Sequence, residues 1–235
     1  MGNFHRRAVS FTKRLMDVVI GLLLLVLTLP LMLVLAIIIK LESKGPALYK
    51  EKRVGLVNGP DFDGAIFNYL KFRTMKAEEK SQDYKVTKIG SWMKRTRLED
   101  LPQLFNVITG EMSIVGPRAE RPELMTPLGS SIPFFEERMR YVKPGITGLA
   151  QINLSYTGEL LELPDDSSLA NLQKTLINPF HMDTVEGAIV DGMRIKLLYD
   201  LAYSAALENF WSFLKTDLSI MLRTPIAMFF HKTKL

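Results

Sequence analysis

The sequence predicts an α+β fold that is mostly helical, with a membrane-associated helix near its N-terminus. Three observations indicate this fold class. Residues 18–39 form an uncharged apolar run, residues 66–75 are rich in aromatic and β-branched side chains, and apolar side chains recur at helical spacing towards the C-terminus. With 235 residues, the chain is long enough for one domain with a sizeable core and accessory elements.

The chain is basic, which narrows the classes of partner. Its net charge is +5 at pH 7, a value that suits nucleic acid, anionic lipid or a phosphorylated substrate. The cations surround carboxylates and flank the apolar run instead of forming an extended basic stripe, so no nucleic-acid partner is predicted. The absence of cysteine excludes disulfides and thiolate chemistry, and the three histidines lack zinc-like spacing.

The apolar run has the length of a membrane segment. As an α-helix, residues 18–39 would extend roughly 33 Å, enough to cross a hydrocarbon core of about 30 Å. The run is too long for a signal peptide, and no small-residue cleavage site follows it. Basic residues on both sides indicate no preferred direction of insertion. Two topologies stay open: a straight spanning helix, and a re-entrant helix that breaks near Pro30 and returns to its starting side.

A strand is predicted at residues 66–75, after a turn-rich connection. Its period of two places Lys71 and Arg73 on the same face. Such a pair is typical of a solvated strand face, and a phosphate-binding pair is the alternative interpretation.

The richest stretch for chemistry contains Glu99 and Asp100, which precede a short run at helical spacing that ends at Gly110. Asp100 is predicted to cap this helix with Gln103 as its reciprocal partner, and Pro102 suits the first turn. Anions are favoured at a helix N-terminus, so a phosphate site is expected beside these carboxylates.

Cations cluster on both sides of the acid pair. Lys94 and Arg95 precede it, and Arg118 follows it in a stiff glycine-proline turn. Guanidinium groups suit phosphate oxygens, although solvated surface charges would give the same pattern. These three residues, together with Lys71 and Arg73, are the predicted phosphate-binding groups.

The residue types favour phosphoryl chemistry. No Walker loop, dinucleotide fingerprint, serine elbow or HExxH pair is present. Neighbouring helical side chains diverge by about 100°, so Glu99 and Asp100 are expected to take separate roles, one as a nucleophile and the other in orientation or metal contact. Magnesium suits this site because it takes one or two carboxylates together with substrate phosphate.

The C-terminal stretch is predicted to form amphipathic helices. Trp211 lies among their apolar residues, with Lys215 and Arg223 close by. Such helices lie in the headgroup region of a membrane or pack against a core, and both interpretations stay open.

Several ordered motifs together resemble the bacterial sugar transferases, the monotopic polyprenyl-phosphate phosphoglycosyl transferases. The matching segments are GPALYKEKRVG, KFRTM, LPQLFNVITGEMSIVGPR and PGITGLAQ. The resemblance implies a re-entrant membrane helix and a small cytosolic catalytic domain with a minor sheet, at the bacterial inner (cytoplasmic) membrane. It also implies Mg²⁺-dependent transfer of a sugar phosphate from a nucleoside diphosphate sugar, expected to be a UDP-sugar, to polyprenyl (undecaprenyl) phosphate. UMP would be released, and synthesis of a surface polysaccharide or glycoconjugate would begin.

The resemblance places the family's nucleophilic aspartate on Glu99 and its following glutamate on Asp100, so the order is reversed here. Glu99 is the preferred nucleophile and metal contact; Asp100 as the nucleophile and an impaired enzyme are the alternatives. Ala119 replaces a usual proline and Leu149 a usual tryptophan, changes that are expected to loosen the loops around the donor. A non-catalytic membrane-surface protein, binding lipid or serving as a glycan-assembly scaffold, is the alternative function.

The expected organisation has five parts and three partners. The parts are a basic N-terminal tail at residues 1–12, a re-entrant helix at 13–40, a catalytic domain at 41–154, an insertion of unknown role at 155–195 and amphipathic helices at 196–235. The partners are a nucleoside diphosphate sugar, polyprenyl phosphate and membrane lipid. The oligomeric state stays open, with a homo-oligomer among the options.

Overall fold

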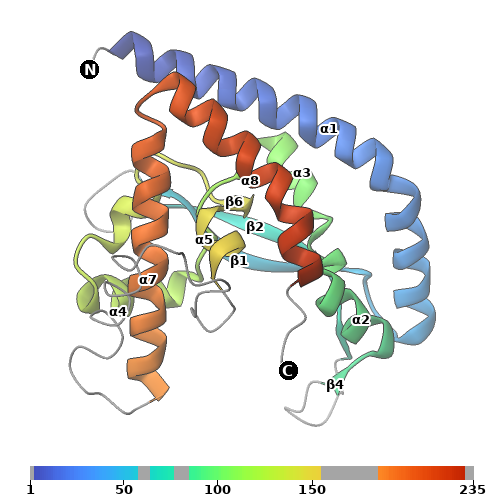
Figure 1. Ribbon diagram of the computed structural model, residues 1–235. Coiled ribbons are helices and arrows are strands. Elements are labelled where there is room, and N and C mark those ends of the chain that lie inside the picture. Colours follow the sequence, from blue (N-terminus) through green and yellow to red (C-terminus); the bar gives the residue numbers. More distant parts are fainter. Residues whose placement is uncertain (1–2, 58–63, 77–84, 155–184, 231–235) are drawn as a thin grey trace.

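The computed structural model describes residues 3–57, 64–76, 85–154 and 185–230, in which helices surround small two-stranded sheets (Figure 1). The α+β class is therefore confirmed. Most of the predicted insertion lies outside the described residues. The elements, in chain order, are α1 (Asn3–Glu42), β1 (Leu48–Val57), β2 (Gly64–Phe72), β3 (Met75–Lys76), β4 (Lys85–Val86), α2 (Lys88–Thr96), the 3-10 turn η1 (Leu98–Asp100), α3 (Gln103–Thr109), β5 (Ser113–Val115), α4 (Pro122–Ser131), the 3-10 helix η2 (Phe135–Met139), β6 (Gly145–Thr147), α5 (Leu149–Asn153), α7 (Val185–Ala206) and α8 (Phe210–Phe230).

The apolar run lies within α1, a helix of 40 residues that includes Pro30. The segment Arg7–Glu42 is long and apolar enough to cross a membrane by length and composition. α1 begins at Asn3, ahead of the boundary expected at residue 13, and it continues through Pro30 without a break. It bends in its second half and then runs down one side of the molecule (Figure 1). Proline removes a helical hydrogen bond and crowds the preceding turn, so a bend replaces the predicted break.

Both ends of the apolar run are attached to the same body of packed helices and sheets. Near the start, the guanidinium of Arg14 donates to two backbone carbonyl groups at the end of α3, at 2.6 and 2.7 Å. At the other end, the carboxylate of Glu42 accepts from the first two backbone N–H groups of α2, at 2.7 and 3.2 Å. Between these attachments α1 stays in contact with the same body, because Leu25 packs against its core and Met32 and Leu35 are buried.

A buried polar network adds a further attachment near the start of α1. Lys13 Nζ lies 2.8 Å from Asp217 Oδ2 in α8 and donates to the Val115 carbonyl of β5 at 3.0 Å. The hydroxyl of Tyr203 in α7 donates to Asp217 Oδ1 at 2.8 Å. A single carboxylate thus joins α1, α7 and α8 beside β5.

The strand predicted at residues 66–75 is confirmed over most of its length. β1 and β2 form an antiparallel hairpin in which Glu51 lies opposite Tyr69. β2 ends at Phe72, and the backbone N–H of Arg73, the next residue, donates to the carbonyl of Ala47 at 2.8 Å in the same antiparallel register. Arg73 thus lies just beyond the strand, and its guanidinium binds the chain at the end of α1.

The glycine-punctuated loop at residues 143–151 contains β6, which pairs in parallel with β5. A Cβ atom on Gly145 would lie 2.1 Å from the backbone nitrogen of Gly116. Only glycine allows this approach. Glycine therefore permits close contact between this loop and the segment that follows β5.

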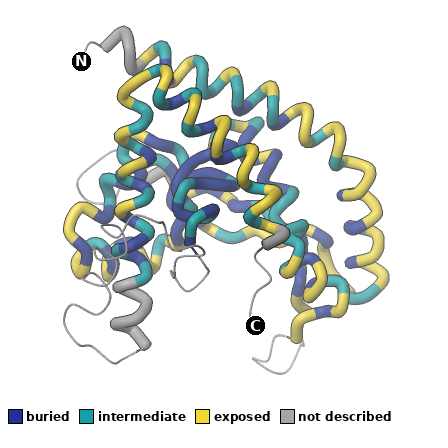
Figure 2. Tube along the Cα trace, in the orientation of Figure 1, coloured by how far each residue is buried: buried dark blue, intermediate teal, exposed yellow. Residues whose placement is uncertain are grey.

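Buried residues concentrate where the β1–β2 hairpin meets α3, α7 and α8, while long stretches of α1 and α8 are exposed (Figure 2). In α8, Phe213 and Ile220 are buried, whereas Trp211, Leu222 and Ile226 are exposed. The predicted helical character of the C-terminal part is confirmed, although α7 begins earlier than expected, at Val185. α8 carries apolar side chains on two faces, only one of which is buried in the core.

Candidate active site

The two carboxylates lie in η1, a single 3-10 turn between α2 and α3. α2 begins after Thr87, whose hydroxyl accepts from the backbone N–H of Gly90 at 2.9 Å. It ends at Arg97, which has a φ of 57° in the left-handed region that non-glycine residues rarely adopt. This conformation ends α2 directly before Glu99 and Asp100.

The predicted helix cap is wrong in its geometry. α3 begins at Gln103 with Pro102 as its cap residue, and no side chain caps it. Gln103 Nε2 does donate to Asp100 Oδ1, but this contact joins two side chains. The backbone N–H of Leu101 instead bonds to the carbonyl of Leu98 within the 3-10 turn, at 3.3 Å. The acid pair therefore occupies the turn before the helix, not its first residues.

Glu99 is half-buried among charges of both signs. Burial raises the pKa of its carboxyl group, and the neighbouring charge of Asp100 adds to this rise. Lys71, Lys94 and Arg97 act in the opposite direction without cancelling it. The structure thus gathers three cations around Glu99 from two elements and the junction between α2 and η1.

Lys71 reaches the acid pair from β2. Its ammonium lies 3.8 Å from Glu51 Oε2 and 5.1 Å from the ring centre of Tyr69. Burial lowers the pKa of Lys71; the charge of Asp100 opposes this shift, and that of Arg118 adds to it. Lys71 therefore lies between the acid pair and the loop that carries Arg118.

The structure does not bring all of the predicted phosphate-binding residues together. Lys71 and Lys94 lie near the carboxylates, and Arg118 lies near Lys71. Arg95 is exposed on α2. Arg73 lies elsewhere, because its guanidinium binds carbonyl groups at the end of α1, including that of Ser43 at 2.7 Å.

The loop that carries Arg118 is held by a buried arginine from η2. Arg138, which is 1% exposed, donates to the backbone carbonyl of Arg118 at 3.2 Å. It also lies 3.2 Å from Glu120 Oε1 and 2.7 Å from Asp200 Oδ2. The backbone of this loop is therefore fixed by an ion triad beneath it.

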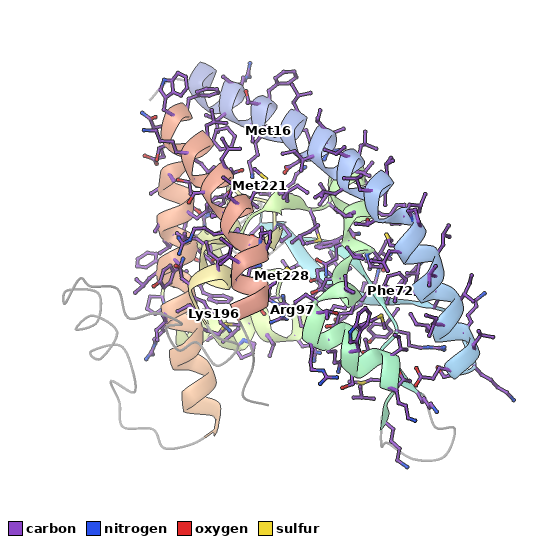
Figure 3. All side chains as sticks on the ribbon, turned by 45° about the vertical axis from the view of Figure 1, so that its right-hand side comes forward. Met16, Phe72, Arg97, Lys196, Met221 and Met228 are labelled. Atoms are coloured by element: carbon purple, nitrogen blue, oxygen red, sulfur yellow. The ribbon has the colours of Figure 1, made fainter. Side chains whose placement is uncertain are left out.

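Sequence reasoning did not assign three charged residues near this site. Arg97 lies close to Glu99, and the sequence feature that could have indicated it was the basic run that ends at residue 97. Glu51 forms an ion pair with Lys71, and the sequence feature that could have indicated it was a single acidic residue within a basic strand. Lys196 in α7 lies near Arg118, whose charge lowers its pKa in addition to the larger effect of burial. Nothing local in the sequence indicated this approach; Figure 3 labels Lys196 and Arg97 on the same lower side of the molecule.

The donor set fits a magnesium ion that is completed by substrate. Within the described ranges, no group of three or more histidine, cysteine, aspartate or glutamate residues lies together. Two adjacent carboxylates are nevertheless available, and the buried Oε1 atom of Gln103 accepts no hydrogen bond. Magnesium prefers oxygen ligands and usually takes one or two carboxylates plus phosphate and water. Glu99 and Asp100 are the residues that could hold it.

This arrangement can support attack of a carboxylate on a phosphoryl group. A carboxylate is repelled by an anionic substrate unless cations neutralise the phosphate oxygens. Here the cations lie on β2, on α2 and in the loop that carries Arg118, so they surround the acid pair. The raised pKa of Glu99 is consistent with a partly desolvated nucleophile.

Comparison with known proteins gives one consistent family. Residues 8–231 match the family model described as bacterial sugar transferase. A putative undecaprenyl-phosphate N-acetylgalactosaminyl 1-phosphate transferase of Bacillus subtilis is 43% identical over 54% of this chain and 72% of its own length. Two UDP-glucose:undecaprenyl-phosphate glucose-1-phosphate transferases are each 40% identical. The protein of Caulobacter vibrioides matches over 64% of this chain and 57% of its own length. The protein of Klebsiella pneumoniae matches over 60% of this chain and 30% of its own length.

Proposed function

Because the chain belongs to the bacterial sugar transferase family, we propose that it transfers a sugar phosphate from a UDP-sugar to undecaprenyl phosphate. The observation that carries this proposal is the position of Glu99 and Asp100 beside Lys71, in a cluster of cations. The relatives, which include UDP-glucose and N-acetylgalactosaminyl transferases by name, support the substrate class. The product would initiate a surface polysaccharide or glycoconjugate.

In the first step, a carboxylate oxygen of Glu99 attacks the phosphorus that bears the sugar. The bond from this phosphorus to the bridging oxygen breaks, and UMP leaves with the electron pair. The sugar phosphate is then joined to Glu99 as an acyl phosphate. Lys71, Lys94 and Arg118 neutralise the phosphate oxygens and lower the barrier to approach of a carboxylate.

In the second step, a phosphate oxygen of undecaprenyl phosphate attacks the same phosphorus. The bond to Glu99 breaks, and its carboxylate returns to the ionised form. Asp100, oriented by Gln103, would hold the metal or orient the substrate. Magnesium, when bound, would supply charge neutralisation at the phosphate oxygens.

The attachment of α1 supports a re-entrant membrane helix. A straight helix of 40 residues would extend roughly 60 Å, which would carry its two ends far apart. Both ends of its apolar run instead contact the same body, and α1 bends between them (Figure 1). With the exposed apolar face of α8 at the same boundary, the catalytic domain would rest on the cytosolic face of the inner membrane.

A donor screen tests the function. Detergent-solubilised protein is incubated with Mg²⁺, undecaprenyl phosphate and either UDP-glucose or UDP-N-acetylgalactosamine, and release of UMP is measured. We expect UMP release with at least one donor and its loss in Glu99→Ala, with a phosphosugar adduct on Glu99 in the absence of lipid. Release of UDP, with no donor phosphate in the lipid product, would instead indicate an ordinary glycosyl transferase.

The two single carboxylate variants separate the remaining alternatives. Retained activity in Glu99→Ala together with loss in Asp100→Ala would make Asp100 the nucleophile. If both variants left cellular function unaltered, the non-catalytic alternative would be favoured. Omission of Mg²⁺ in the presence of a chelator is expected to abolish UMP release.

A further inference from the structure

Glu51 in β1 lies at the centre of three cations and has no role in the reaction described above. Its Oε2 atom accepts from Arg53 Nη2 at 2.9 Å and lies 3.8 Å from Lys71 Nζ. Its Oε1 atom lies 2.8 Å from Arg121 Nε. Burial alone would raise the pKa of Glu51, yet the hydrogen bond from Arg53 and the surrounding charges hold it below its usual value. Glu51 is therefore ionised at neutral pH, and one carboxylate balances only one of three cations.

Arg53 is the inner member of this group and is held by the protein through both of its terminal nitrogens. It is 7% exposed, and its Nη1 atom donates to the carbonyl of Ala119 at 3.1 Å. The backbone N–H of Val54 also donates to the carbonyl of Glu120, at 2.9 Å. These contacts fix the chain between Arg118 and Arg121 to β1, the strand that carries Glu51.

Arg121 differs from Arg53 because most of its side chain faces solvent. Its side chain is 58% exposed, whereas that of Glu51 is 14% exposed. The ion pair with Glu51 is made at Nε, the inner nitrogen of the guanidinium. A guanidinium held at Nε presents both terminal amino groups outward, in the planar arrangement that suits phosphate oxygens.

We propose that Arg121 is a further substrate-binding residue that contacts a phosphate oxygen, and that Glu51 is the positioning residue that holds it beside Lys71. This inference rests on the proposed function and extends its site past Arg118 to the start of α4. The phosphate belongs either to the UDP-sugar or to undecaprenyl phosphate, since both substrates bring the same chemistry to this site.

Equilibrium binding to the full chain in detergent tests the role of Arg121 without requiring turnover. UDP and a short-chain polyprenyl phosphate serve as separate probes of the two phosphate sources. We expect Arg121→Gln to weaken one of them about tenfold, the loss typical of one charge-assisted hydrogen bond. Arg140→Gln is the matched control, because Arg140 also forms an ion pair near the surface, 3.1 Å from Glu137. Unchanged binding of both probes by Arg121→Gln would overturn the proposal, whether or not the protein releases UMP.

The sign of the effect of Glu51→Gln tests the positioning role. A carboxylate repels an anionic ligand, so loss of its charge alone would tighten binding. If Glu51 positions Arg121, the variant should weaken the same probe that Arg121→Gln weakens, and should weaken it less when Arg121 is already absent. Tighter binding, or full additivity of the two changes, would contradict the positioning role. Glu51→Asp should restore part of the affinity.

Discussion

Replacement of Arg138 by methionine should destabilise the protein more than any change to a surface charge. Arg138 is 1% exposed, and its guanidinium contacts Glu120 Oε1 at 3.2 Å and Asp200 Oδ2 at 2.7 Å. The two carboxylate side chains are 8% and 2% exposed, so neither can recover its hydration when the guanidinium is removed. Methionine fills much of the volume, which leaves the unpaired charges as the main cost.

Breaking a buried ion pair from one side costs about 3 to 5 kcal/mol, because it leaves an uncompensated charge. For a chain of 150 to 250 residues, each kcal/mol corresponds to about 2 to 4 °C in Tm. We therefore expect Arg138→Met to lower Tm by roughly 6 to 20 °C. Arg118 should also be displaced, since its backbone carbonyl loses its donor.

Thermal unfolding of the detergent-solubilised protein, followed by circular dichroism, measures this effect. Arg140→Met is the matched control: its ion pair with Glu137 is about one third exposed on each side, so it should change Tm by at most about 4 °C. Adding Glu120→Gln and Asp200→Asn to Arg138→Met should recover much of the loss, because the triad then contains no unpaired buried charge. A fall of less than 2 °C in Arg138→Met, or no recovery in the triple variant, would refute this account of the triad.

Three further predictions concern the site and α1. Glu99 must be ionised to attack and its pKa is raised, so UMP release should decline on the acid side at a pH above the usual carboxyl pKa of 4.5. Lys94→Met removes a cation that lowers the pKa of Glu99, and it should therefore move this decline to higher pH. An unmoved pH profile would contradict the assignment of Glu99. Because the chain has no cysteine, Ser10→Cys and Lys44→Cys each give a single labelling site, one on either side of the apolar run. An impermeant maleimide should label both sites from the same side of inverted vesicles. Labelling from opposite sides would indicate a spanning helix. Arg73→Met should cost about 1 to 3 kcal/mol of folding free energy, because the guanidinium of Arg73 binds the end of α1. The affinity for the sugar donor should not change. Weakened donor binding at unchanged stability would instead support a phosphate-binding role for Arg73.

Local patterns in the sequence predicted the features that depend on neighbouring residues. The apolar run, the strand around Lys71 and the helical C-terminal stretch each carry their own periodicity, and each is observed. The acid pair was also found from its local surroundings. Its backbone was predicted less well, because Asp100 two residues before Pro102 is compatible with both an N-cap and a 3-10 turn, and the left-handed Arg97 carries no signal such as glycine.

Contacts between distant segments could not be predicted in this way. Arg73 was grouped with Lys71 by strand periodicity, but the end of α1 lies close enough to bind its guanidinium. Glu51 gathers cations from β1, β2 and the start of α4, and only the folded hairpin brings these together. Ala119 was expected to loosen its loop, yet it is 2% exposed and its carbonyl accepts from Arg53. Tertiary hydrogen bonds replace the stiffness that a proline would supply.

The ion pair between Lys13 and Asp217 has a consequence for the order of biosynthesis. The two residues are 204 positions apart, so α1 leaves the ribosome long before its partner in α8 is made. An apolar run that inserts during synthesis would enter the bilayer while Lys13 still lacks its carboxylate, and α8, the last helix of the described chain, would complete the attachment. A nascent chain arrested before α8 would contain the acid pair and its cations, and the start of α1 would be held through α3, β5 and the ring of Tyr203 in α7.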